Sequence, residues 1–225
     1  MAPPSDTRSK AVVFDLDGVL VDSEGLRFGV YRDLLAGYGV ELSVEVYERE
    51  WVMAGRGPEY AVETWDLPVT AAEMRALRAP LYVAALEAGL RPMPGAREAL
   101  DRLSKGHRLA LATNSVAAEV EIALERLGPD APFDAVVSRE DYARRKPAPD
   151  AFLEAARRLG VPAPRCLVVE DADRGVRAAR AAGMACVAVR HPLNGSCDFA
   201  GARRVLGSLD ELTSALVEAL LPTGA

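Results

Sequence analysis

Two acidic residues one position apart, Asp15 and Asp17, follow the apolar run 11–14, and Gly18 comes next. Side chains repeat every second residue along an extended strand, so both carboxylates leave the strand on the same side. Two carboxylates at the mouth of a buried strand repel each other unless a cation, usually a metal ion, lies between them. The spacing therefore predicts a chemical site at the end of a strand.

A second set of polar residues follows the apolar stretch 108–112. Thr113 and Asn114 supply a hydroxyl and an amide where a helix is expected to begin. Free backbone N–H groups at a helix start suit a phosphate. The alternative is that Thr113, Asn114 or Ser115 only caps the helix.

One cation and a second acidic pair complete the candidate site. Lys146 is one of three lysines among 27 cationic residues, and the proline after it restricts its backbone. A lysine here indicates a compact point charge beside an anion, with a solvated surface lysine as the alternative. Glu170 and Asp171 follow the apolar stretch 166–169.

The pattern of strands and helices around these groups predicts a Rossmann-like α/β fold. Apolar strands alternate with amphipathic helices, which is typical of a parallel sheet covered by helices on both faces. Ligands bind at the carboxyl ends of such strands. The expected strands are 11–15, 108–112, 135–138, 166–170, 185–190 and 204–206. The expected helices are 96–103, 116–127, 149–159, 174–182 and 209–220.

The segment 24–91 has helical periodicity and no clear buried strand, and a linker rich in proline and glycine follows it. We therefore expect an inserted helical cap at 24–91. The α/β core should comprise 11–23 and 92–225, and residues 1–10 should be a disordered leader.

Acidic pairs that face each other across the strand ends suit Mg²⁺, which prefers oxygen ligands and commonly bridges carboxylates to a phosphate. Asp15 can accept a phosphoryl group as an aspartyl-phosphate. Lys146, the Thr113 hydroxyl and nearby amides would stabilise the transferring charge. Asp17 is placed to protonate the leaving oxygen and then to deprotonate the attacking water.

The chain resembles the haloacid dehalogenase superfamily, in the branch of phosphatases and phosphomutases with a small helical cap. The resemblance rests on four motifs in the family's order, which are residues 15–24 (DLDGVLVDSE), 113–115 (TNS), 146–152 (KPAPDAF) and 169–184 (VEDADRGVRAARAAGM). It implies that Asp15 is the nucleophile, Asp17 the acid and base, and Thr113, Asn114 and Lys146 the phosphate-binding residues. It also implies Mg²⁺ ligands, namely Asp15, the backbone carbonyl of Asp17, and Asp171, with Glu170 at or next to the coordination shell.

In this family the cap selects the substrate. The cap here contains no lysine, which excludes the imine chemistry of phosphonate-cleaving relatives. Relatives of the β-phosphoglucomutase type have a histidine at the position of Arg27. Arg56, next to Gly55, is the best candidate for binding a second phosphate, with a solvated arginine as the equal alternative. Trp51 and Trp65 are expected to pack the core of the cap.

Three further residues are expected to be structural. Asp173 should cap the helix that follows it, and His107 and His191 should not be catalytic. Cys166, Cys186 and Cys197 have no metal-type spacing and predict no disulfide framework.

Charge and composition limit the kinds of partner that the protein can be expected to bind. The net charge of −6 argues against nucleic acid and anionic membranes, and no apolar run is long enough to span a bilayer. The N-terminal residues lack the apolar middle of a signal peptide, so we expect a cytoplasmic protein. A monomer is favoured.

The function expected from these residues is a Mg²⁺-dependent phosphatase for a small phosphorylated metabolite such as a sugar phosphate. The alternative is a phosphomutase that returns the phosphoryl group to its substrate. A non-catalytic binding or regulatory module is the third possibility.

Overall fold

The computed structural model describes residues 8–222 of the chain. Six strands form one sheet in the order β3-β2-β1-β4-β5-β6, and every neighbouring pair is parallel. The strands are β1 Ala11–Phe14, β2 Arg108–Ala112, β3 Ala135–Val137, β4 Cys166–Glu170, β5 Ala185–Val189 and β6 Arg204–Leu206. Val13 of the central strand pairs with Ala110 on one side and Val168 on the other. This register brings the carboxyl ends of β1, β2 and β4 to one edge of the sheet.

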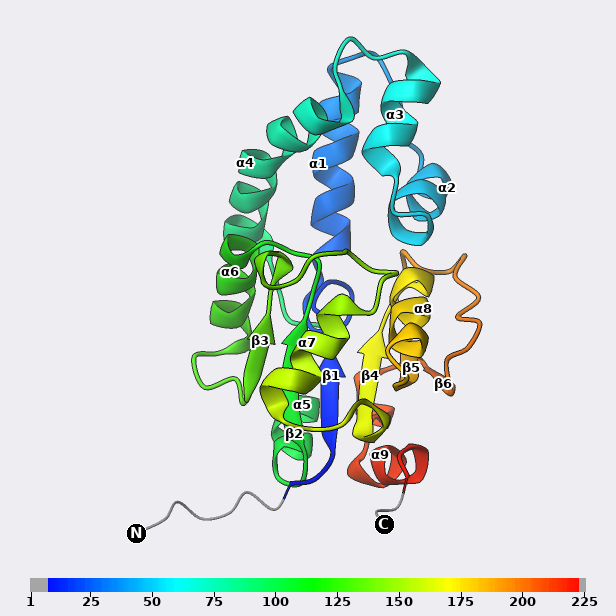
Figure 1. The fold of residues 1–225 in the computed structure, drawn as a ribbon. Coiled ribbons are helices and arrows are strands. Elements are labelled where there is room, and N and C mark those ends of the chain that lie inside the picture. Colours follow the sequence, from blue (N-terminus) through cyan, green and yellow to red (C-terminus); the bar gives the residue numbers. More distant parts are fainter. Residues whose placement is uncertain (1–7, 223–225) are drawn as a thin grey trace.

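Helices cover both faces of the sheet (Figure 1). They are α5 Ala96–Ser104, α6 Ala117–Leu127, α7 Asp150–Leu159, α8 Asp173–Ala181 and α9 Ser214–Leu220, with short 3₁₀ turns η2 Arg139–Asp141, η3 Ala163–Arg165 and η4 Leu209–Glu211.

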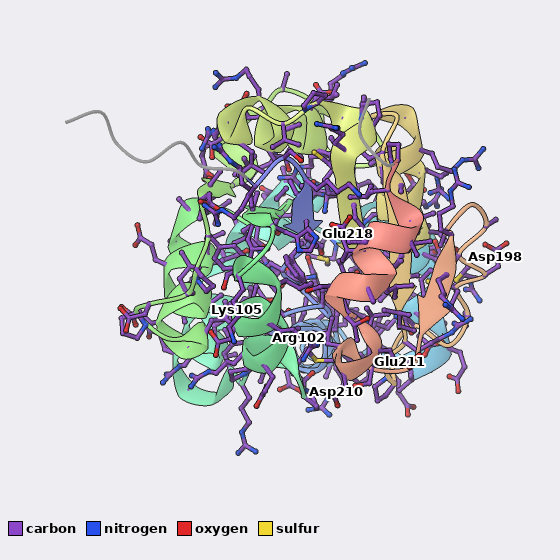
Figure 2. The ribbon with its side chains drawn as sticks, turned by 90° about the horizontal axis from the view of Figure 1, so that it is seen from below. Arg102, Lys105, Asp198, Asp210, Glu211 and Glu218 are labelled. Atoms are coloured by element: carbon purple, nitrogen blue, oxygen red, sulfur yellow. The ribbon has the colours of Figure 1, made fainter. Side chains whose placement is uncertain are left out.

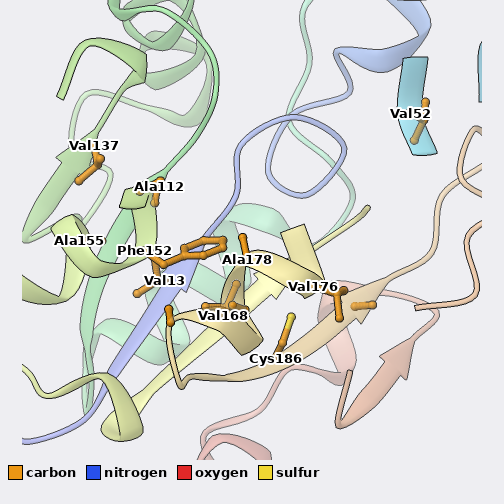
Figure 3. Packing of buried hydrophobic residues seen from close by; sticks show 14 of the residues in the cluster. Val13, Val52, Ala112, Val137, Phe152, Ala155, Val168, Val176, Ala178 and Cys186 are labelled. Atoms are coloured by element: carbon orange, nitrogen blue, oxygen red, sulfur yellow. The ribbon is translucent and has the colours of Figure 1, made fainter. Parts of the chain in front are cut away.

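Strand alternation divides the core into two clusters, because successive side chains of a strand face opposite sides. Val13 belongs to the cluster under α7 and α8, and Val12 to the cluster that includes residues of α5 and α9. Figure 3 shows Phe152 of α7 beside Val13 and Ala178. The predicted α/β class with helices on both faces is confirmed.

A helical segment lies over the carboxyl ends of the strands (Figure 1). It contains α1 Glu24–Ala36, α2 Val44–Tyr47, a π-helix η1 Glu48–Met53, α3 Gly57–Trp65 and α4 Ala71–Gly89. Thr70 and Glu73 form a reciprocal capping box that starts α4. Trp51 and Trp65 pack as expected, because each ring meets Tyr60 edge to face, at 6.5 and 5.5 Å between centroids.

Part of the expected leader is ordered. Arg8 forms an ion pair with Asp134 at 2.7 Å, and the Lys10 ammonium lies 2.6 Å from Glu218. Figure 2 shows Glu218 on the underside of the molecule. Residues 8–10 are therefore anchored to the core, whereas residues 1–7 lie outside the described part of the chain.

Three local predictions are wrong. The expected helix 209–220 is two elements, η4 and α9, because Leu212 leaves the helical conformation with φ −80° and ψ 82°. Asp173 does not cap α8, since Ala172 holds that position and the Asp173 carboxylate accepts a hydrogen bond from the Phe199 amide instead. None of Thr113, Asn114 and Ser115 caps the next helix, because Val116 holds the N-cap position of α6. No helix among residues 8–222 is long and apolar enough to cross a membrane.

Candidate active site

The turn after β1 places the first acidic pair at the sheet edge. The Asp15 amide donates to the Val169 carbonyl at 2.9 Å, so this residue continues the sheet alignment beyond the strand. Gly18 adopts φ +73°, and a Cβ there would lie 2.3 Å from Asp171 Oδ2. Only glycine fits at this close approach. The turn therefore packs the ends of β1 and β4 directly against each other.

Lys146 lies at the centre of the site, with its side chain 2% exposed. Its ammonium donates to Asp15 Oδ1 at 2.6 Å, to Glu170 Oε1 at 2.7 Å and to the Ala112 carbonyl at 3.0 Å. Burial alone would lower the pKa of Lys146, but the two carboxylates outweigh it and hold that pKa above its ordinary value. Lys146 therefore remains a cation between the ends of β1, β2 and β4.

Asp15 is destabilised as an anion. Burial raises its pKa to about 7, although Lys146 opposes the shift, and Glu170 and Asp17 add repulsion. Burial also raises the pKa of Asp171. Asp15, Glu170 and Asp171 each offer an oxygen within 4.8 Å of the others. Three buried carboxylates beside one lysine leave an excess of negative charge, which fits a hard divalent cation.

Hydrogen bonds decide which oxygens are available to such a cation. Glu170 Oε1 is bound by Lys146, and Oε2 accepts from the amides of Asp171 and Ala172 at 3.0 and 3.3 Å. Asp171 Oδ2 is bound by His191. Among residues 8–222, Asp15 Oδ2 and Asp171 Oδ1 have no hydrogen-bond partner. Asp15 and Asp171 are therefore the side chains best placed to hold the metal, with Glu170 tied to Lys146 beside them.

Asp17 is enclosed by hydrogen-bond donors from three residues. Ser23 and Ser115 hydroxyls donate at 2.5 and 2.6 Å, and the Arg27 guanidinium lies 2.9 Å from Oδ1. Burial would raise the pKa of Asp17, but Arg27 and the two hydroxyls lower it to about 2. Asp17 is an ionised carboxylate in this arrangement. It must leave part of this enclosure before it can carry a proton.

The predicted phosphate-binding residues follow β2. Thr113 Oγ1 accepts from the Ser115 amide at 3.0 Å, which shapes the turn before α6. Asn114 Oδ1 accepts from the Tyr142 hydroxyl at 2.7 Å and from the Lys146 amide at 3.3 Å. Asn114 therefore ties the loop that carries Lys146 to the end of β2.

A cavity of about 530 Å³ opens between the strand ends and the helical segment. Asp15, Asp17, Thr113, Asn114 and Lys146 all line it, and Glu170 lies at its base. Six arginines line it as well, namely Arg27, Arg75, Arg78, Arg145, Arg174 and Arg177.

The structure does not bring Arg56 to this cavity. Its side chain is 53% exposed and lies 3.6 Å from Glu50 and 3.4 Å from Glu63. Gly55 does line the cavity. The flanking glycines thus bring the backbone close to the site while the Arg56 side chain stays in solvent.

Comparisons with known proteins identify the family of this chain. The family model for haloacid dehalogenase-like hydrolases matches residues 9–183, which include all four sequence motifs except the last residue of the fourth. The chain belongs to this family. It is a haloacid dehalogenase-like hydrolase, and the predicted family is confirmed.

The hydrolase is similar to two named proteins in sequence and to one solved structure in fold. It is 33% identical over 191 residues to the fructose-1-phosphate phosphatase YqaB of Escherichia coli (strain K12), covering 81% of this chain and 97% of that protein. It is 36% identical over 193 residues to the protein SUPPRESSOR OF QUENCHING 1, chloroplastic, of Arabidopsis thaliana, of which it spans only 18%. The crystal structure of CbbY from Rhodobacter sphaeroides in complex with phosphate matches with a TM-score of 0.79 at 28% identity, covering 93% of this chain and 99% of that one.

Sequence reasoning assigned no site role to several residues that the hydrolase brings together. Ser23 and Ser115 lie inside the motifs 15–24 and 113–115, so their positions in the sequence could have indicated a role at the site. Arg27 occupies a position singled out in the cap, but its contact with Asp17 follows only from the packing of α1. Arg174 donates to the carbonyls of Trp51 and Val52, at 2.9 and 2.5 Å, and thereby joins α8 to the helical segment.

Proposed function

We propose that this hydrolase is a Mg²⁺-dependent phosphatase for a small phosphorylated sugar and that Asp15 carries the phosphoryl group during turnover. The observation that supports this most directly is Lys146 held between Asp15 and Glu170, beside Asp171. Asp15 and Asp171 would hold the metal. When bound, Mg²⁺ would neutralise the charge of the phosphoryl oxygens.

The chain's own residues account for both half-reactions. Asp15 Oδ2, which has no hydrogen-bond partner among residues 8–222, attacks phosphorus while the bond to the ester oxygen breaks. Once Asp17 has left part of its hydrogen-bond enclosure and has taken up a proton from solvent, it supplies that proton to the departing oxygen. Asp17 then accepts a proton from water, whose oxygen attacks phosphorus and releases inorganic phosphate from Asp15. Lys146 remains beside the nucleophile throughout.

The cavity lining favours a substrate with several oxygen atoms. Trp51 Nε1 and Arg78 Nε are buried donors for which residues 8–222 supply no hydrogen-bond acceptor, and both residues line the cavity. Buried donors are costly unless an acceptor meets them, and sugar hydroxyls are suitable acceptors. The name of the related fructose-1-phosphate phosphatase is consistent with this substrate class.

A phosphomutase is the second candidate, and one observation favours it. Arg145 and Arg177 line the cavity, and within the described chain the guanidinium group of neither has an ion-pair or hydrogen-bond partner. Such cations suit a second phosphate on the substrate. A mutase would return the phosphoryl group from Asp15 to the substrate, so a bisphosphate would activate turnover and free phosphate would not accumulate.

A panel of phosphorylated sugars and one generic ester, each assayed for free phosphate with Mg²⁺ or with a chelator, tests the proposal. We expect Mg²⁺-dependent phosphate release that the Asp15→Asn variant abolishes while its circular dichroism is unchanged. Intact mass after acid quenching should show one phosphoryl group on the protein, and none on Asp15→Asn. Substantial turnover by Asp15→Asn would refute the nucleophile, and absence of hydrolysis of every ester would leave the non-catalytic module.

A further inference from the structure

The loop after β5 contacts the second acidic pair at two points. His191 Nε2 lies 2.9 Å from Asp171 Oδ2, and the two side chains are 5% and 4% exposed. Asn194, which is 1% exposed, donates its amide to the Asp171 backbone carbonyl and to the Val189 carbonyl, both at 2.9 Å. The loop thus holds Asp171 by its carboxylate and by its backbone.

Hydrogen bonds within the loop assign the histidine tautomer. The Leu193 amide donates to His191 Nδ1 at 3.2 Å, so Nδ1 presents a lone pair. The ring proton therefore resides on Nε2 and is donated to Asp171 Oδ2. The His191 amide in turn donates to Asn194 Oδ1 at 3.0 Å. Both sides of the imidazole are engaged, and the ring has one orientation.

The turn after β1 closes the arrangement from a third direction. A Cβ at Gly18 would meet Asp171 Oδ2 at 2.3 Å and His191 Nε2 at 2.8 Å. The absence of a side chain at Gly18 is what lets the histidine and the carboxylate meet beside the nucleophile turn. Asp171 is left with one carboxylate oxygen, Oδ1, that no hydrogen bond from the described residues occupies.

We propose that His191, supported by Asn194, is a positioning residue that holds Asp171 for Mg²⁺ and thereby sets the affinity of the hydrolase for the metal. This inference rests on the Mg²⁺ site of the proposed function. Hydrogen bonds to the outer oxygen of a ligating carboxylate orient the inner oxygen, and their loss typically weakens metal affinity about 10- to 100-fold. His191 is therefore structural in the sense expected from the sequence, but the structure that it maintains is that of the metal site.

The test is isothermal titration of Mg²⁺ into the full-length protein without substrate. We expect His191→Ala to weaken Mg²⁺ binding about 10- to 100-fold. His191→Gln should recover most of the affinity, because its side-chain amide can donate to the same oxygen. His191→Leu replaces His191→Ala if the smaller side chain prevents folding, as judged by circular dichroism.

His107 provides a matched control, because it is the other of the two histidines in the chain. It is 2% exposed and directly precedes β2, at the end of the strand opposite the acidic cluster. Its ring lies 3.0 Å from Glu218, which Figure 2 labels on the underside of the molecule. His107→Gln should bind Mg²⁺ as the wild type does. Equal weakening by the His107 and His191 variants would mean a general loss of packing and would overturn the inference.

Unchanged Mg²⁺ affinity in folded His191→Ala or His191→Leu would also overturn the positioning role of His191. A folded His191→Gln that binds Mg²⁺ as weakly as His191→Ala would overturn it as well. The proposed function fails separately. A wild type that binds Mg²⁺ in a His191-dependent way but hydrolyses no phosphate ester refutes the phosphatase and leaves the positioning role intact. A wild type that binds no Mg²⁺ overturns both.

Discussion

Removing the carboxylate of Asp15 should stabilise the metal-free protein against unfolding even though it abolishes activity. Burial raises the pKa of Asp15 from 3.8 to about 7. The folded state therefore binds this proton more tightly than the unfolded state. Stability from this group is fully present below about pH 4 and is lost as the pH rises through 7.

The size of the effect follows from the shift. Each pH unit between the two pKa values costs about 1.4 kcal/mol, so the ionised Asp15 destabilises the fold by at most about 4 kcal/mol at pH 8 and about 2 kcal/mol at pH 5. An asparagine has nearly the shape of the protonated carboxyl and does not titrate. Its Oδ1 still accepts from Lys146, which also keeps Glu170 at 2.7 Å.

Urea unfolding followed by far-ultraviolet circular dichroism, at pH 5 to 8 with a chelator, measures this difference. The free energy of unfolding of Asp15→Asn should exceed that of the wild type by a margin that widens toward pH 8. Excess Mg²⁺ should narrow the margin, because it binds the folded wild type. Asp101→Asn, an exposed site in α5, should show no margin at any pH. A margin that is the same at pH 5 and pH 8 would refute the reasoning.

Two further predictions concern the walls of the site. Gly175→Ala places a Cβ 1.8 Å from the Glu170 carboxyl carbon, so this variant should lose about 1–3 kcal/mol of stability in thermal unfolding and should have a lower kcat. Gly29→Ala, in a helix where a Cβ would meet nothing within 4 Å, should be neutral or stabilising. Equal effects of Gly175→Ala and Gly29→Ala would exclude a role for crowding at Glu170. Trp51→Phe removes one buried N–H but keeps the aromatic packing, so it should raise the KM for a sugar phosphate several-fold and leave the KM for the generic ester unchanged. Parallel changes of KM for both substrates would exclude a contact between Trp51 and the sugar.

The sequence alone predicted the strands of the sheet and the polar side chains that follow them. Apolar runs of four or five residues between amphipathic helices specify buried parallel strands, because a strand covered on both faces needs apolar side chains on both sides. Asp15, Thr113 and Glu170 each follow such a run, and Lys146 lies in the loop before the helix Asp150–Leu159. Chain order therefore predicted that they meet at one edge.

The sequence did not predict which loops contact one another. His191 and Asp171 are 20 residues apart, and nothing in either neighbourhood indicates the other; only the bend after β5 and the missing side chain at Gly18 bring them together. The same holds for Arg27 and Asp17, which meet because α1 packs with its first turn over the strand ends.

The choice among arginines shows the same division most clearly. With 24 arginines in the chain, residue type and flanking glycines favoured Arg56, yet its side chain lies in solvent while six others line the cavity. Residue type and strand periodicity determine which chemistry is present and at which edge of the sheet. Which charged side chains face one another is decided by helix packing and loop geometry, because these set distances between residues that the chain order leaves independent.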